Sequence, residues 1–175
     1  MKKVILLFFL IIFTPCISFA VDSIKIGCVD FQKVLNESDI GKKAKSDLES
    51  LVKSKQSVID EKGRVIDKMK SDLEKQASVL SADAKKSKEE ELEKMAREYQ
   101  RLVQDSQTEV KKKELELTDG IIKEIREIVE NMGEEEGYTL ILEKGGGIVL
   151  YSRKEIDITD EVMKKYNQSK TKTKK

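Results

Sequence analysis

The stretch KKAKSDLESLVKSKQSVIDEKGRVIDKMKSDLEKQASVL, residues 42–80, carries apolar side chains at seven-residue intervals in a background rich in Lys and Glu. It belongs to a longer stretch, residues 42–132, that lacks proline and contains only two glycines, Gly63 and Gly120. Helical spacing kept over such a length exceeds what an ordinary globular helix needs. It predicts two long helices that fold back on each other as an antiparallel hairpin arm.

The apolar column on the first predicted helix has a counterpart on the second. Columns of this spacing form the seam of a coiled coil, because the supercoil keeps positions seven apart facing the partner helix. If facing residues have position numbers that sum to 169, Ile59 lies opposite Val110 and Ile66 lies opposite Val103. This register puts the reversal near residues 82–87, where small and polar residues replace the apolar column. The predicted seam comprises Val52, Ile59, Ile66, Leu73, Ala96, Val103, Val110 and Leu117.

The first twenty residues have the pattern of an export signal. Lys2 and Lys3 precede an apolar run over residues 4–13, and Ser18-Phe19-Ala20 forms a small-x-small cleavage site. The run is shorter than the roughly twenty apolar residues that a membrane-spanning helix needs. We therefore expect cleavage after Ala20 and a mature chain in the periplasm.

Past the signal, few residue types that support catalysis remain. Histidine is absent and Cys28 is the only cysteine left, so a disulfide within one chain is impossible and the usual zinc ligands are lacking. Carboxylates are numerous, but they fall on solvated helix faces without a nucleophile motif. We predict no enzymatic activity, no catalytic residue, no cofactor, no metal and no nucleic-acid partner. Cys28 lies in an apolar run, and we expect it to be buried.

Short β-like segments flank the arm. Residues 24–30 alternate as a strand does, and two further runs, 138–143 and 148–151, flank a glycine turn and predict a β-hairpin. Thr159 has the side chain of a helix cap, and Asp160 and Glu161 suit the positive end of a short helix.

These segments define the predicted domain organisation. Residues 21–41 and 133–168 form the body, residues 42–132 form the arm, and residues 169–175 form a disordered basic tail. A body this small, split between the two ends of the chain, buries too little surface alone and favours self-association. The predicted fold class is α+β, with a long antiparallel helical coiled-coil hairpin arm projecting from a small β-rich oligomerisation body.

Two pairs of local strings resemble a known family. VDFQKVLNES (29–38) with GKKA (41–44) is similar to the N-terminal signature of the Skp/OmpH family of periplasmic chaperones. YTLILEK (138–144) and DITDEV (157–162) are similar to its C-terminal signature. The resemblance implies a homotrimer with a shared β core, whose three arms enclose a cavity. It also implies that the cavity holds unfolded outer-membrane proteins without ATP.

One departure from this family bears on how such partners would be gripped. Well-known members are strongly basic, whereas this chain without its signal is close to neutral. We therefore expect apolar contacts along the arm to matter more than charge, with adaptable methionines contributing. The candidate client-binding residues are Leu51, Val58, Val65, Met69, Met95 and Leu102.

Two further hypotheses follow from the sequence. The lysines of the tail would give at most a weak contact with anionic membrane surfaces. The alternative function is that of an exported coiled-coil spacer or adaptor in an envelope assembly.

Overall fold

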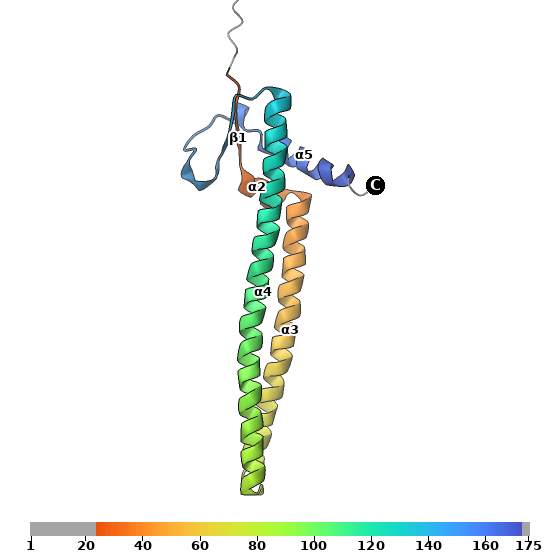
Figure 1. Cartoon of the computed structure of the whole chain (residues 1–175), viewed down its shortest axis with the longest axis vertical. Coiled ribbons are helices and arrows are strands. Elements are labelled where there is room, and N and C mark those ends of the chain that lie inside the picture. Colours follow the sequence, from red (N-terminus) through yellow and green to blue (C-terminus); the bar gives the residue numbers. More distant parts are fainter. Residues whose placement is uncertain (1–23, 173–175) are drawn as a thin grey trace, which may run out of the picture.

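The computed structural model describes residues 24–172. The elements follow one another as β1 (Ile26–Val29), α2 (Phe31–Glu37), α3 (Asp39–Gln76), α4 (Ala82–Glu136), β2 (Leu140–Glu143) and α5 (Thr159–Lys172). Two short 3-10 turns, η1 (Gly145–Gly147) and η2 (Lys154–Ile156), lie between β2 and α5. Figure 1 shows α3 and α4 side by side as a long arm, with the remaining elements gathered at one end. We call that end the body. The predicted export signal lies outside the described residues.

The arm is longer and its reversal earlier than the sequence predicted. Helix α3 has 38 residues and begins at the cap of Ser38, whose Oγ accepts a hydrogen bond from the Gly41 N–H at 3.1 Å. At about 1.5 Å per residue, α3 extends roughly 57 Å. Helix α4 has 55 residues and ends at Gly137, which adopts a left-handed conformation with φ of 69°. Such a conformation favours glycine because no Cβ clashes with the backbone.

The predicted turn at residues 82–87 is wrong by about five residues. Helix α3 ends at Gln76 and α4 begins at Ala82, so the chain reverses over residues 77–81. The physical reason is a helix cap: Ser81 Oγ accepts a hydrogen bond from the Ala84 N–H at 3.2 Å, and Asp83 suits the positive end of the helix. These residues therefore start a helix rather than form a loop.

Two contacts across the arm show its register. Lys55 Nζ lies 2.6 Å from Glu109 Oε2, and the position numbers of this pair sum to 164. A Cβ built on Gly63 would lie 3.7 Å from the ring of Tyr99, a pair whose numbers sum to 162. The predicted sum of 169 is therefore wrong by five to seven residues.

The error of nearly one heptad has a simple cause. Apolar positions recur every seven residues on both helices, so sliding one helix by seven again puts apolar residues opposite each other. In the register of the observed contacts, Ile59 is level with Val103 rather than with the predicted Val110. The earlier turn decides between registers that the apolar columns alone leave equivalent.

The sheet is smaller than predicted and its two strands run parallel. Ile26 of β1 is level with Leu140 of β2, and an isolated bridge joins Cys28 to Asp157. Parallel strands need a long crossover connection, and here the whole arm provides it. The prediction of a β-rich body is thus wrong within the described residues, because most of the body is helical.

The predicted β-hairpin at 138–143 and 148–151 does not form. Gly145–Gly147 form the 3-10 turn η1, in which Gly146 and Gly147 have positive φ of 70° and 73°. Residues 148–151 then run as an irregular segment, in which Leu150 is 93% exposed. Within the described residues, β2 pairs with β1 and no strand follows η1.

The core lies where α2, α4 and α5 meet the sheet. Val34, Ile125, Val162 and Tyr166 are fully buried, and the Tyr166 hydroxyl donates a hydrogen bond to Glu124 Oε2 at 2.8 Å. Cys28 is buried in β1, as the sequence predicted. The core thus joins both ends of the chain to the last turns of α4.

Helix α5 begins at Thr159 as predicted but runs farther than expected. It continues to Lys172, so residues 169–172 are helical rather than part of a disordered tail. Residues 173–175 lie outside the described part of the chain.

Candidate functional site

The arm buries its apolar side chains only in part. Between residues 42 and 120, every apolar residue is at least partly exposed to solvent, and Ser106 is the one buried residue. Among the predicted seam residues, all but Val52 are half-buried; these are Ile59, Ile66, Leu73, Ala96, Val103, Val110 and Leu117. A two-helix arm has no third layer to complete its burial. Its apolar surface therefore remains available along most of its length.

Two neighbouring residues on α3 have exposures that the predicted columns do not explain. Val52, assigned to the seam, is 44% exposed, whereas Leu51, assigned to the flanking column, is half-buried. The two positions lie about 100° apart around the helix, and both columns have the seven-residue spacing of a seam. Spacing alone does not distinguish them.

The other candidate client-binding residues divide into two groups. Val58 and Val65 lie on the surface of α3 at 44% and 49% exposure. Met69, Met95 and Leu102 are half-buried nearer the tip. The structure thus does not bring the six candidates together in one pocket, and they form a scattered apolar surface.

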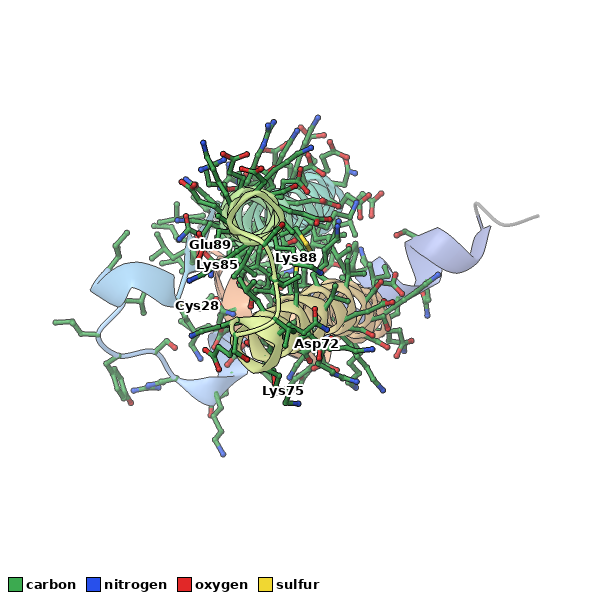
Figure 2. All side chains as sticks on the ribbon, turned by 90° about the horizontal axis from the view of Figure 1, so that it is seen from below. Cys28, Asp72, Lys75, Lys85, Lys88 and Glu89 are labelled. Carbon is green, nitrogen blue, oxygen red and sulfur yellow. The ribbon has the colours of Figure 1, made fainter. Side chains whose placement is uncertain are left out.

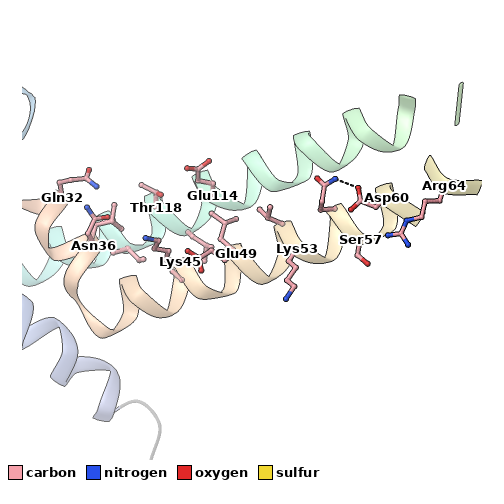
Figure 3. A pocket seen from close by; sticks show the side chains of 17 residues that line it. Gln32, Asn36, Lys45, Glu49, Lys53, Ser57, Asp60, Arg64, Glu114 and Thr118 are labelled. Atoms are coloured by element: carbon pink, nitrogen blue, oxygen red, sulfur yellow. Dashed lines mark hydrogen bonds between the residues drawn. The ribbon is translucent and has the colours of Figure 1, made fainter. Parts of the chain in front are cut away.

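A groove at the base of the arm was not predicted. It has a volume of about 930 Å³ and follows one side of α3 from Ala44 to Arg64, against α4 and the end of α2. Figure 3 shows Gln32 and Asn36 of α2 at one end, and Glu114 and Thr118 on the α4 side. We call this feature the basal groove. Its apolar lining consists of Leu35, Ala44, Leu48, Val52, Leu117 and Ile121.

The residues that form the basal groove follow a pattern in the sequence that can be recognised only once the fold is known. Ala44, Leu48 and Val52 recur every fourth residue, so they form a single ridge on α3. Leu117 and Ile121 form the matching ridge on α4. The apolar spacing alone did not show that α2 closes one end.

The tip of the arm carries charges of both signs. Figure 2 looks along the arm from the tip and shows charged side chains radiating from both helices, among them Lys75, Lys85, Lys88, Asp72 and Glu89. Lys85 Nζ lies 3.8 Å from Glu89 Oε1, one turn along the same helix. Exposed pairs of this kind contribute little energy. Basic and acidic side chains therefore offset each other locally at the tip.

A polar cluster ties three segments of the body together. Lys144 Nζ, after β2, lies 2.6 Å from Asp157 Oδ2, and the Thr159 N–H donates to Asp157 Oδ1 at 3.1 Å. The Asp30 N–H, after β1, donates to Thr159 Oγ1 at 2.9 Å. Burial opposes the ionisation of Asp157, but the hydrogen bonds from Lys144 and Thr159 outweigh it and lower its pKa to about 2. This cluster is structural, since each of its polar groups bonds to another member.

The body also exposes large apolar side chains. Ile148 and Tyr151 are 78% and 82% exposed on the irregular segment after η1, and Ile24 before β1 is 73% exposed. Exposed apolar side chains that gather into a patch are a feature of surfaces that bind a partner.

Residues 24–172 contain no group of three His, Cys, Asp or Glu side chains arranged to hold a metal ion. Among the helices in that range, none combines the length and the hydropathy required to cross a bilayer.

Comparisons with known proteins agree with this architecture. The chain is similar in fold to a crystal structure described as a candidate outer membrane chaperone (OmpH-like) from Caulobacter crescentus CB15, with a TM-score of 0.78 and 17% sequence identity. The similarity covers 83% of this chain and 85% of the other. No curated protein matches the sequence.

The family itself is identified from the sequence. The family described as Outer membrane protein (OmpH-like) matches residues 25–166, which include the body and the arm. This match confirms the resemblance inferred from the two pairs of signature strings. The chain therefore belongs to the OmpH-like outer membrane protein family.

Proposed function

We propose that the protein is a holding chaperone, which binds unfolded outer-membrane proteins in the periplasm without nucleotide and keeps them from aggregating. Membership in the OmpH-like family, a chaperone family, supports a binding role rather than catalysis. The observation that carries the proposal is the arm, whose apolar side chains remain partly exposed between residues 42 and 120. Many weak apolar contacts hold a partner without imposing a shape on it.

We also propose that the body self-associates, as a holding cavity requires more than one arm. The exposed apolar residues Ile148, Leu150 and Tyr151 support a contact between copies, because they have no partner to cover them within the described chain. The trimer is the assembly implied by the family resemblance. Sedimentation at micromolar concentration tests it, and a stable monomer would contradict the cavity.

The holding activity is tested by diluting a urea-unfolded β-barrel membrane protein into buffer and following light scattering. We expect the protein to suppress scattering with no nucleotide present. An unrelated helical coiled coil at equal mass is the control for crowding and surface effects. If the protein self-associates but the client aggregates as in buffer alone, the spacer or adaptor function is favoured instead.

The structure also allows the arm to be shortened without disturbing its register. Residues 60–66 and 96–102 face each other when position numbers sum to 162, as they do for the contact of Gly63 with Tyr99. Deleting both heptads together keeps the apolar columns aligned while removing surface. We expect this variant to fold and self-associate normally but to suppress aggregation less well at equal concentration.

A further inference from the structure

The basal groove has the length of a short extended strand. Its lining follows α3 from Ala44 to Arg64, which is about 30 Å at 1.5 Å per residue. An extended chain advances about 3.3 Å per residue, so about nine residues fill the groove from end to end. A membrane-spanning β-strand has about 9–11 residues. The groove thus matches one strand of a barrel, rather than a whole domain.

The charges around the groove favour an occupant with few charges of its own. Three basic side chains are balanced by three acidic ones; they are Lys45, Lys53 and Arg64 against Glu49, Asp60 and Glu114. A balanced rim gives no net attraction to a strongly acidic or basic segment. Charged side chains of such a segment would also lose hydration over the apolar floor without finding a dedicated partner.

The polar side chains of the rim suit an extended backbone. Gln32 and Asn36 stand at the α2 end of the groove, and amide side chains both donate and accept hydrogen bonds. An extended segment has unpaired backbone N–H and C=O groups that need such partners, whereas a helix satisfies its own. An alternating segment would place apolar side chains on Leu48 and Val52 and its backbone near the rim.

We propose that the basal groove binds one extended, charge-poor segment of an unfolded membrane protein, about nine residues long with apolar side chains at alternate positions. This proposal rests on the holding function and assigns that function a specific binding site. The groove proposal differs from a model in which the whole arm binds clients equally, because it gives Val52 a role that the equally exposed Val58 does not share.

Two substitutions on the same helix provide a matched comparison. Val52 lines the groove and Val58 does not, yet both are 44% exposed. The probe is a ten-residue peptide alternating Val or Leu with Thr or Gln, with blocked ends, a fluorophore and an uncharged solubilising linker. We expect Val52→Ser to weaken binding by at least about fivefold in fluorescence anisotropy, because a buried valine contact is lost. Val58→Ser is expected to bind the peptide like the unmodified protein, because Val58, a client-binding candidate from the sequence, lies outside the groove and the groove proposal excludes it from this site.

A second measurement tests whether the groove prefers a peptide with few charges. Replacing the polar positions of the peptide by Asp, or in a second peptide by Lys, is expected to weaken binding to the unmodified protein. If either charged peptide binds more tightly than the neutral one, the inferred preference is overturned.

The remaining outcomes separate the groove from the holding function. Equal binding by Val52→Ser and Val58→Ser shows that the groove is not the site. A change of sedimenting mass in Val52→Ser alone shows that a second copy covers it, which also overturns the proposal. If the unmodified protein suppresses aggregation but does not bind the neutral peptide, the groove proposal fails while the holding function stands.

Discussion

The body and the arm are built from the same kinds of residues but bury them to different degrees. In the body, Val34, Ile125 and Val162 are fully buried among three helices and a sheet. In the arm, which has only two helices, Ile59 and Ile66 remain half-buried. Stability scales with the apolar area removed from water, so we infer that the body supplies most of the folding free energy. The arm keeps apolar surface exposed at the expense of its own stability.

The packing of the arm depends on how α3 and α4 are aligned. A crosslinking test of this alignment has an all-or-none outcome. In the observed register, cysteines at positions 59 and 103 are expected to react with a short bifunctional thiol reagent, whereas cysteines at 59 and 110 are not. Mass spectrometry of the digested protein measures this. Buried Cys28 serves as an internal control that should stay unmodified. Crosslinking of only the 59 and 110 pair would restore the sum of 169.

Matched isoleucine substitutions test the comparison directly. Ile125→Ala creates a cavity in the body core, and we expect it to lower the free energy of unfolding by about 2–5 kcal/mol. Ile59→Ala removes a half-buried contact in the arm, and we expect less than half of that loss. Urea unfolding at one fixed protein concentration measures both, since self-association makes stability concentration-dependent. Equal losses would show that the arm is as firmly packed as the body.

The polar cluster of the body gives a pH-dependent prediction. The pKa of Asp157 is lowered to about 2, below its usual value of 3.8, so its ionised form stabilises the folded state. This contribution is fully present above about pH 4–5 and is lost as the pH falls towards 2. We expect Asp157→Asn to cost about 1–2 kcal/mol at neutral pH.

The measurement is the difference in unfolding free energy between the unmodified protein and Asp157→Asn, taken at several pH values. The difference should shrink towards zero near pH 2, because the unmodified carboxylate then becomes protonated. A difference that stays constant down to pH 2 would show that the ion pair with Lys144 does not stabilise the body.

The smallest expected effect concerns a glycine within the arm. A Cβ at Gly63 would meet the Tyr99 ring at 3.7 Å, an ordinary van der Waals distance, so alanine fits there without strain. We expect Gly63→Ala to stabilise the arm by about 0.5–1 kcal/mol through the helical preference of alanine. Hydrogen exchange of arm amides should slow while body amides are unchanged. Faster exchange in the arm would indicate a clash with Tyr99.

Part of the architecture was predictable from the sequence because it depends on the spacing and type of side chains along each segment. The helical apolar spacing of residues 42–132, which lapses only at the predicted turn, predicted the hairpin arm, and the alternation over residues 24–30 predicted the strand that contains Cys28. The side-chain type at Thr159 predicted where the last helix begins, although Thr159 Oγ1 accepts a hydrogen bond from the Asp30 N–H. Each of these signals is local and has one physical interpretation.

For the features that were not predicted, the sequence alone is compatible with more than one arrangement. A heptad pattern repeats itself after a slide of seven residues, so the register needed the position of the turn at 77–81. The pairing of β1 with β2 joins segments more than a hundred residues apart, which no local alternation reveals. The basal groove depends on how α2 meets the arm, and only the packed structure shows this.

The parallel pairing of β1 with β2 has a consequence for how the chain folds. Lys25 and Thr139, which meet at the start of the sheet, are separated by 114 positions along the chain. Closing a flexible loop of that length costs about 4 kcal/mol beyond a constant, by the logarithmic dependence of closure entropy on length. If α3 and α4 pair from the tip first, most of that loop is already ordered when the strands meet. Formation of the arm would then bring β1 and β2 together and reduce the entropy cost of forming the sheet.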